Sequence, residues 1–323
     1  MFKNLRELIA SMPDEKTCRE YIAQQRWPDG VICPYCGCDK IYRIVERDRY
    51  KCASKDCAKK FSVTIGLVFQ DSKIALSKWL TAVYLATAHK KGISSYQLGK
   101  DIGVSQKSAW FMLHRIREGL RENAPEMLEG IIESDETYMS RKFASDFKGL
   151  PPEEVEAIRS NNYNTKNKGA VVGLAERKTK KVRITSFDSN NAENLRSVIK
   201  KNVAPNSDLF TDESFLYRKG LEEFFHATVN HSKREWVRGI IHTNNVENFW
   251  SVMKRGVYGI YHQISYKHLQ RYCDEYSYRY NSRKLRDDQR FIVALQGLQG
   301  RLSYNKLVHG KEDKIKGNPK KEK

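Results

Sequence analysis

The pattern of apolar and polar residues changes along the chain, and each change marks a predicted boundary between parts. Apolar residues recur at helical spacing from residue 4 to about 25, and again over 76–88, 96–102 and 106–121. Beyond Pro125 the pattern becomes one of short β-branched and apolar runs, which favours strands. We therefore predict four parts: 1–72, 73–124, 125–290, and a C-terminal helix with a basic tail over 291–323.

The third part is predicted to form a mixed sheet covered by helices. Three strands before the first helix imply an antiparallel meander, and the later alternation of strands with helices implies parallel pairs. The polar stretch 140–168 is predicted to be an exposed insertion. This order predicts a multi-domain α/β protein with an RNase H-like core. Its predicted strands are 128–138, 169–176, 182–187, 208–212 and 224–229, with helices over 192–203 and from residue 242.

Five of the seven cysteines crowd between Cys33 and Cys57, which favours a metal site over disulfide bonds. Zinc is the usual metal for four cysteines, and four thiolates leave no open position, so its role would be structural. Gly37 is expected to supply a tight turn, and Cys38 is a spare. Ordinary reduced cysteines are the alternative. The predicted zinc ligands form two pairs, spaced by two and four residues: Cys33, Cys36, Cys52 and Cys57.

The residues after the cysteines predict a strand and then a DNA-binding motif. Residues 61–69 are rich in β-branched and aromatic side chains and are expected to close the ribbon as a strand. Helices over 96–102 and 106–121 flank a turn at Gly103, with Ser105 as the expected N-cap, an order typical of a helix-turn-helix. A helical hairpin with a solvated basic face is the alternative. The predicted DNA contacts of the second helix are Gln106, Lys107, Ser108 and Arg115.

Composition indicates a polyanionic partner. The chain has 58 Lys and Arg against 39 Asp and Glu, a net charge of +19, and an isoelectric point near 9.5. Basic side chains near phosphates release condensed counterions, so such a surface suits nucleic acid. No apolar run is long enough to span a membrane, and the N-terminus lacks the apolar core of a secretion signal. We expect a cytoplasmic, nucleoid-associated bacterial protein without a membrane partner.

Acidic residues at two strand ends stand out against this basic background. The run 131–138 is apolar and then ends in carboxylates, which delivers Asp135 near the strand tip, and 208–212 delivers Asp212 in the same way. A third acid would come from the helix that begins near His242. Three carboxylates at one place can hold two hard divalent cations and leave room for substrate oxygens. The sequence therefore predicts an acidic pocket for divalent metal inside a DNA-binding protein.

Several different short motifs are spread along the chain, between about residue 15 and residue 285. They are Cys33-Pro34-Tyr35-Cys36, residues 61–64 running into Gly66, Ser134-Asp135-Glu136-Thr137-Tyr138, residues 242–251 through Lys254-Arg255-Gly256, and residues 272–281. In this combination they resemble the ISXO-like insertion-sequence transposases. The resemblance implies a zinc ribbon, a helix-turn-helix and a DDE catalytic core of RNase H-like fold.

The resemblance also implies the roles of individual residues. Asp135, Asp212 and Glu247 match the catalytic carboxylates, which would bind two Mg²⁺ or Mn²⁺ ions. Lys254 matches the basic residue two helical turns after the third acid. Because Glu247 and Lys254 are seven residues apart, they lie on one helix face, and the lysine could reach a phosphate beside the metals.

Alternatives to these ligands remain open at the sequence level. Some relatives use asparagine in the third position, so Asn244 or Asn248 could share it. Two of the acids also have acidic neighbours. Glu133 shares the strand face of Asp135, Glu136 points to the opposite face, and Glu213 follows Asp212.

Aromatic and basic residues interleave from 249 to 284, and the exposed cations among them are candidates for contacts with the DNA backbone. The predicted contacts are Lys254, Arg255 and Arg271. His226, His231 and His242 flank the predicted site and could orient a carboxylate or contact phosphate; a structural role is the alternative for each. Residues 311–323 are expected to be a basic, weakly DNA-attracting tail.

The sequence thus predicts a DNA transposase that binds the terminal inverted repeats of its element, cuts strands with Mg²⁺, and joins the freed 3′-hydroxyls to target DNA. Cutting two ends together requires at least a homodimer on double-stranded DNA. A nuclease on the same core, which cuts without joining, is the enzymatic alternative. A zinc-ribbon and helix-turn-helix regulator without catalysis is the other.

Overall fold

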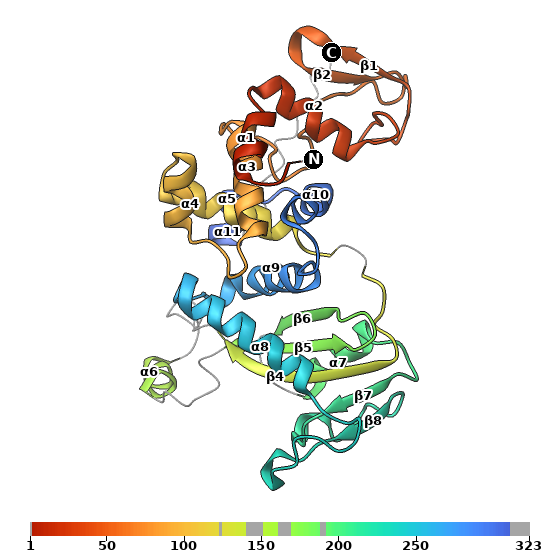
Figure 1. Cartoon of the computed structure of the whole chain (residues 1–323), viewed down its shortest axis with the longest axis vertical. Helices are drawn as coiled ribbons and strands as arrows, with labels where there is room; N and C mark the ends of the chain where they lie inside the picture. The colour runs from red at the N-terminus through yellow and green to blue at the C-terminus, as the bar shows by residue number, and fades with distance from the viewer. Residues whose placement is uncertain (1, 123–124, 140–150, 161–168, 188–191, 311–323) are drawn as a thin grey trace. The chain divides into compact units, whose positions relative to one another are not determined.

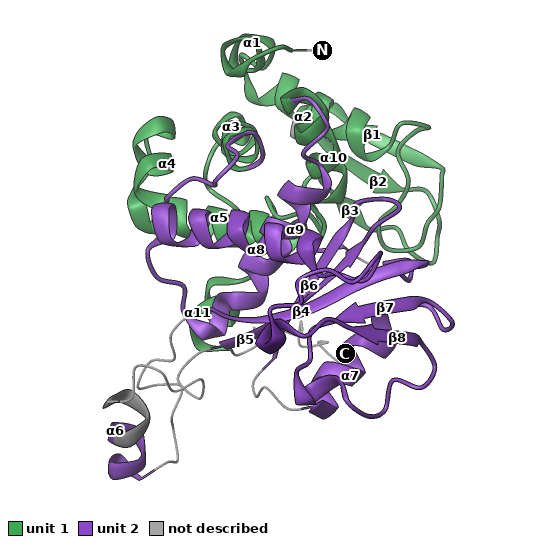
Figure 2. Cartoon of the chain, turned by 60° about the horizontal axis from the view of Figure 1, so that its bottom comes forward, with its two compact units in different colours: residues 1–86, 95–119, 287–323 green, residues 87–94, 120–286 purple. Residues whose placement is uncertain are grey.

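The computed structural model describes residues 2–122, 125–139, 151–160, 169–187 and 192–310. Two compact units interleave along the chain, coloured separately in Figure 2. Unit 1 comprises residues 1–86, 95–119 and 287–323, and unit 2 comprises residues 87–94 and 120–286. The four-part division expected from the sequence stays a prediction.

Unit 1 begins with two helices and a small antiparallel sheet. The helices are α1 (Leu5–Ser11) and α2 (Glu15–Arg26), each capped at its N-terminus by an Asn4 or Asp14 side chain. The sheet has the order β1-β2-β3. Its strands are β1 (Ile41–Ile44), β2 (Arg49–Cys52) and β3 (Lys60–Phe61), with a 3₁₀ turn, η1 (Val45–Arg47), between the first two.

The strand predicted over 61–69 is wrong beyond Phe61. The chain turns repeatedly instead, with Ile65 N–H donating to Ser62 and Leu67 N–H to Thr64. Arg26 Nη1 donates to the carbonyls of Val63 and Ile65, both at 2.7 Å, and stabilises these turns. Most of the β-branched and aromatic side chains are buried here without forming a ladder, because propensity for strands mainly reflects burial.

The helical part of unit 1 has the predicted order. Gly103 has φ +62° and ends the helix before it, and Ser105 Oγ accepts from Ser108 N–H as the N-cap of the next helix. Gly99 passes so close to the Val104 carbonyl that a Cβ there would lie 2.9 Å from it, so the turn requires glycine. The helices are α3 (Leu76–Ala88), α4 (Ser95–Ile102), α5 (Gln106–Gly119), α10 (Asp287–Gly297) and α11 (Tyr304–His309).

Unit 2 contains a five-stranded mixed sheet in the order β6-β5-β4-β7-β8. β4 pairs antiparallel with β5 and β5 with β6, whereas β7 runs parallel to β4 and β8 parallel to β7. The predicted antiparallel meander and parallel pairs are therefore confirmed, and the sheet is that of an RNase H-like core. The strands are β4 (Ile131–Met139), β5 (Gly169–Glu176), β6 (Val182–Phe187), β7 (Asp208–Thr211) and β8 (Phe225–Thr228).

Helices cover both faces of this sheet (Figure 1). One face packs against α8 (Asn244–Gly256) and α9 (Leu269–Asn281), through a core that includes Val171, Val246 and Trp250. The other face packs against α7 (Ala192–Asn202) and the 3₁₀ turn η4 (Phe215–Tyr217). β7 and β8 are joined through η4 rather than through a full helix. Further short elements are α6 (Pro152–Ser160), η5 (His231–Lys233), the π-helical η6 (Val257–Tyr261) and η7 (Tyr266–His268).

Two of the predicted segments lie wholly or mostly outside the described residues. These are the insertion 140–168, of which only 151–160 is described, and the tail 311–323. None of the helices that the structure describes has both the length and the apolar composition needed to cross a lipid bilayer.

Candidate active site and metal centre

The four predicted zinc ligands come together at one end of the small sheet of unit 1. Their sulfur atoms all lie within 4.8 Å of one another. Cys33 Sγ is 3.7 Å from Cys57 Sγ, and Cys36 Sγ is 3.6 Å from Cys52 Sγ. Four sulfurs at the Zn–S distance around a tetrahedral ion lie about 3.8 Å apart, so the spacing fits zinc. Cys38 stays outside the group, with its thiol 3.7 Å from the Lys40 carbonyl.

Local backbone geometry forms this cysteine group. Gly37 has φ +74° and its N–H donates to Cys33 O, which closes the expected tight turn. Burial works against a charged Cys33, but backbone N–H groups of Tyr35 and Cys36 outweigh it and lower the pKa of its thiol to about 7. Burial raises the pKa of Cys52 to about 12. Four thiolates this close would repel one another without a cation between them, so the donor set fits a metal.

The register of the large sheet brings two acids to neighbouring positions. Asp212 directly follows β7 as predicted, but Asp135 lies in the middle of β4 and not at its tip, because the pairing with β5 continues to Met139. β4 and β7 pair in parallel with Ile131 opposite Asp208 and Glu133 opposite Phe210. Continuing this register by two residues sets Asp212 beside Asp135. Neighbouring strands lie about 4.8 Å apart, and side chains in register point to the same face. Asp135 and Asp212 therefore share the sheet face that α8 covers.

Helix α8 brings the third predicted acid to this place. Glu247 lies in its first turn and Lys254 in its last, on one helix face. The Trp250 indole, on the same helix, donates to Asp135 Oδ2 at 3.0 Å. Gly173 lies opposite Asp135 on β5, and a Cβ at Gly173 would come 2.6 Å from the Trp250 ring. The glycine thus leaves the space through which the indole reaches the carboxylate.

The acids act on one another electrostatically. Burial raises the pKa of Asp135 to about 7, and the charges of Glu136, Asp212 and Glu247 add to the rise. Burial likewise raises the pKa of Asp212, with a further contribution from Glu247. A carboxylate cluster with raised pKa values stores repulsion that a divalent cation would relieve. Among the described residues, only the cysteines form a group of three or more ligand atoms already closed around one point.

Glu133 has a structural role, because both of its carboxylate oxygens accept hydrogen bonds from the protein. It is fully buried, and Oε1 accepts from Arg177 Nε and Asn245 Nδ2, both at 2.6 Å. Oε2 accepts from the backbone N–H groups of Asn245 at 2.7 Å and Val246 at 3.3 Å. Arg177 also donates to the carbonyls of Ile240 and His242. This network holds the start of α8, and so Glu247, against β4.

The other two acidic neighbours, Glu136 and Glu213, also accept hydrogen bonds from the protein. Glu136 Oε2 accepts from the Tyr217 hydroxyl at 2.7 Å, on the opposite sheet face from Glu133. Glu213 accepts from the N–H groups of His231 and Ser232 and from the Ser232 hydroxyl, and these bonds lower its pKa to about 2.

The three acids that match the family motif accept fewer hydrogen bonds than Glu133 and Glu213. Asp135 accepts from Trp250, Asp212 from Ser214 N–H, and Glu247 from the Thr243 hydroxyl, each at one oxygen. Within the described part of the chain, the second oxygen of each has no hydrogen-bond donor. Their geometry leaves these three carboxylates able to take a metal.

The flanking histidines differ in what they contact. His231 Nε2 lies 3.9 Å from Glu247 Oε1, and the positive form of His231 would lower the pKa of Asp212. His242 Nδ1 lies 3.3 Å from Glu133 Oε1. His226 Nε2 is 2.9 Å from the Thr211 hydroxyl. Of the three, His231 is the one in contact with a candidate catalytic acid.

Comparison with known proteins shows the family to which the chain belongs. A family model described as the ISXO2-like transposase domain matches residues 127–281, and one described as a transposase zinc-ribbon domain matches residues 13–60. The uncharacterized protein in transposable element ISH50 of Halobacterium salinarum is 30% identical over 261 residues, which span 76% of this chain and 84% of that protein. The chain belongs to the ISXO2-like transposase family.

A solved structure also aligns with this transposase. It is the cryoEM structure of simian T-cell lymphotropic virus intasome in complex with PP2A regulatory subunit B56 gamma. The identity is 13% and the TM-score 0.27, over 62% of this chain and 63% of that chain, just under two thirds of its length. A TM-score this low supports no conclusion.

The predicted DNA contacts of the transposase fall into two groups. Gln106, Lys107 and Arg255 are exposed, and Ser108, Lys254 and Arg271 are partly exposed. Arg115, in contrast, is 5% exposed and donates to the Gln70 carbonyl at 2.6 Å. Its guanidinium lies over the rings of Trp79 and Phe111. We therefore leave Arg115 out of the proposed DNA-binding surface.

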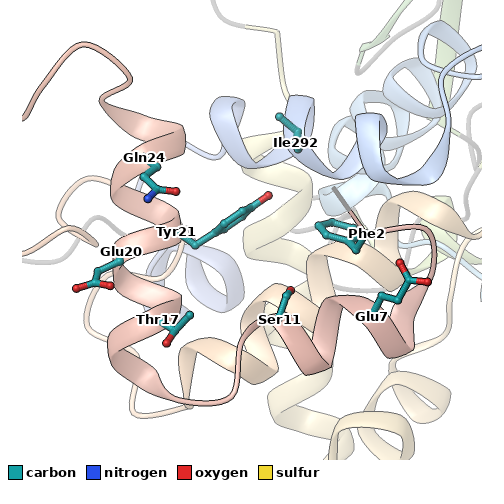
Figure 3. A pocket seen from close by; sticks show the side chains of 8 residues that line it. All are labelled: Phe2, Glu7, Ser11, Thr17, Glu20, Tyr21, Gln24 and Ile292. Carbon is teal, nitrogen blue, oxygen red and sulfur yellow. The ribbon is translucent and has the colours of Figure 1, made fainter.

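Unit 1 of the transposase also has a pocket of about 440 Å³ among α1, α2 and α10 (Figure 3). The Tyr21 ring points from α2 towards Phe2 and Ile292. Two carboxylates line it, of which Glu7 accepts from Asn4 and Lys3, and Glu20 pairs with an arginine of the ribbon. Among the described residues, those that line the pocket include two carboxylates and no lysine or arginine.

Sequence reasoning missed three functional contributions. Arg177 follows β5 in what looks like an ordinary basic turn, and nothing in that turn signals that it holds α8. Trp250 stands in an aromatic run whose helical spacing indicates core packing. Gly173 has a role only because it lies opposite Asp135 on the neighbouring strand and leaves space for the Trp250 ring. Each role depends on the register between strands or on the docking of α8, which residue spacing alone does not reveal.

Proposed function

We propose that this transposase binds the ends of its element, cuts DNA strands there and joins the freed 3′-hydroxyls to target DNA. The observation that supports the proposal is that Asp212, directly after β7, and Glu247, in the first turn of α8, both lie close enough to Asp135 on the parallel neighbour β4 to raise its pKa. Each retains one oxygen without a protein donor among the described residues, and the pKa values of Asp135 and Asp212 are raised.

The donor chemistry of these acids fits Mg²⁺ or Mn²⁺, which prefer oxygen ligands and retain several waters. Asp135, Asp212 and Glu247 would hold two such ions. Bound there, the ions would supply charge neutralisation at the attacking and leaving oxygens of a phosphoryl transfer. Trp250 keeps the Asp135 carboxylate oriented, and the Glu133–Arg177 network keeps Glu247 at the same place.

The basic residues around the site would position DNA. Lys254 lies two turns beyond Glu247 on α8, within reach of a phosphate next to the acids, and Arg255 is exposed beside it. The exposed start of α5 would read an element end from unit 1. Because two ends are cut together, the active form on DNA is a dimer or a larger assembly. The zinc ribbon supplies a rigid part and no chemistry, since its four thiolates leave no open ligand position.

The test is an assay with a labelled duplex copied from the end of the element, which is read from DNA bordering the gene. With Mg²⁺ or Mn²⁺ the protein is expected to nick the end and to join it to a supercoiled plasmid. Nicked ends without joined products would favour a nuclease. Binding without nicking, with either metal, would favour a DNA-binding regulator and overturn the proposal.

The acidic cluster also predicts a pH-dependent stabilisation by metal. Because the folded pKa of Asp135 is about 7 and the ordinary value near 4, the metal-free fold binds a proton more tightly than the unfolded chain. That contribution to stability is complete below pH 4 and is lost as pH rises to 7. Mg²⁺ must displace the proton below pH 7, so its apparent affinity should fall about tenfold per pH unit there.

Thermal melts with and without Mg²⁺ or Mn²⁺ measure this effect. The rise in melting temperature is expected to be larger near pH 8 than near pH 5.5. Asp208→Asn, which changes the acid at the other end of β7, should leave the pattern unchanged. Equal shifts at both pH values would contradict a metal site that includes Asp135.

A further inference from the structure

Residues 230–241, which we name the arm, connect β8 to α8 beside the acidic cluster. The teal chain in Figure 1 loops out past the edge of the sheet here before it enters α8. The arm is part of the ISXO2-like domain match but contains none of the residues that the family motif assigns to catalysis. The inference drawn from it rests on the proposed function.

The arm is held firmly at both ends and in its middle. Glu213, next to Asp212, accepts three hydrogen bonds from His231 and Ser232 at its start. The Asn230 side chain accepts from Lys233 N–H at 2.9 Å. Arg238 pairs with Ile241 through an isolated bridge and donates to the Thr228 carbonyl at 2.8 Å. A loop with so many internal bonds presents its side chains in defined positions.

A ring contact links the arm to the acids. His231 Nε2 lies 3.9 Å from Glu247 Oε1, and its atom is buried without a hydrogen-bond partner. The His231 ring packs against the Trp236 ring, with centroids 4.6 Å apart and 38° between the planes. Trp236 is nevertheless 57% exposed. One face of its ring is therefore supported by a residue of the candidate active site while much of the rest is open to solvent.

The surroundings of Trp236 suit a nucleic acid better than a protein. Val237 and Ile240 are also exposed, which makes the tip apolar. Lys233, Arg234 and Arg238 are exposed around it. Glu235 is the one acid of the arm, and it is occupied by Asn230 N–H and by Arg238. An apolar ring within a ring of cations, beside a phosphoryl-transfer site, matches a base and its flanking phosphates.

We propose that the arm binds DNA next to the bond that is cut, with Trp236 stacked on a base that has left the duplex. Lys233 and Arg234 contact the phosphates on either side of that base. The ligand is thus element-end DNA with at least one unpaired base, and no base-specific hydrogen bond is required, because every base offers a ring face. Stacking holds the strand so that its phosphate stays at the acids.

The test compares two duplexes in Ca²⁺ or without metal, so that no cutting is needed. Both are copied from the element end, one fully paired and one with mismatched bases at the tip. The wild-type protein should bind the mismatched duplex more tightly. Trp236→Ala should weaken that binding by about 5- to 100-fold and change binding to the paired duplex less, whereas Trp236→Phe should retain much of the preference.

Phe225→Ala is the matched control for Trp236→Ala. Phe225→Ala removes another exposed aromatic, 65% exposed on the edge strand β8, and should leave the preference unchanged. The inference is overturned if Trp236→Ala keeps the wild-type preference, or if it weakens both duplexes equally. It is also overturned if sedimentation without DNA shows that Trp236→Ala dissociates a dimer, since the arm would then bind a second copy. Failure of the wild-type protein to cut or join would contradict the proposed function and leave this comparison intact.

Discussion

Asp135→Asn or Asp212→Asn is expected to abolish strand cutting and joining while binding of the element end stays near the wild-type level. Both substitutions keep the size of the side chain and remove the charge that would hold a cation. Loss of metal-supplied stabilisation of several kcal/mol corresponds to at least about a 10³-fold slower reaction. The measurement is the rate of nicking of the labelled end duplex with Mg²⁺, beside a gel-shift measurement of binding to the same duplex.

The same variants should become more stable than the wild-type protein without metal. Asp135 is partly buried among other acids, and its pKa of about 7 shows that the charged form is disfavoured there. A neutral amide removes that repulsion, and the Trp250 indole can still donate to it. The melting temperature of metal-free Asp135→Asn near pH 8 should therefore exceed that of the wild-type protein, as is common when a strained functional site is neutralised.

Asp208→Asn is the matched control for both readouts. Asp208 begins the strand that Asp212 follows, so the substitution tests the same chemistry at the opposite strand end. It should leave cutting, joining and stability unchanged. Cutting by Asp135→Asn at a rate near that of the wild-type protein would remove Asp135 from the active site, and with it the main support for a DDE mechanism.

Residue patterns alone predicted the sheet because strand pairing here follows local rules. Alternation along 131–139 is enough to place Glu133 and Asp135 on one face and Glu136 on the other, and the contacts of all three agree. Three predicted strands without a predicted helix between them are enough to predict the meander, and it holds although the unpredicted helix α6 lies between β4 and β5. Cysteine spacing is likewise sufficient to predict the metal centre, because two pairs at this spacing can supply four sulfurs to one tetrahedral ion.

The sequence alone could not show which of several neighbouring polar residues belongs to the active site or to the DNA-binding surface. Glu133 and Asp135 differ only in which partners a docked helix brings to them. The helical spacing of Arg115 allows an exposed cation, yet its long stem packs along Trp79 and Phe111 and its head reaches a carbonyl. The turns after Phe61 depend on two hydrogen bonds from Arg26, which is far away in the sequence. Tertiary contacts decide each of these cases.

Cys52→Ser is expected to remove zinc from unit 1 and to unfold the small sheet. The sheet has strands of only four, four and two residues, so backbone pairing alone cannot stabilise it. Few large side chains are buried against it, chiefly Trp27 and Phe61. Structural zinc contributes about 10–16 kcal/mol in isolated fingers, more than such a core supplies. A serine hydroxyl is a poor replacement for a buried thiolate ligand.

Zinc content per chain and limited proteolysis over residues 13–60 report on this variant. Cys38→Ser is its control, because Cys38 directly follows the Cys33–Gly37 turn but lies outside the sulfur group, and the variant should retain zinc and protease resistance. The large sheet of unit 2 has its own core, so Mg²⁺-dependent stabilisation should survive in Cys52→Ser while binding of the element end weakens. A Cys52→Ser protein that keeps one zinc and a resistant ribbon would show that the four sulfurs are not the ligand set. Loss of metal stabilisation in unit 2 would instead show that the ribbon and the acidic cluster fold as one cooperative unit.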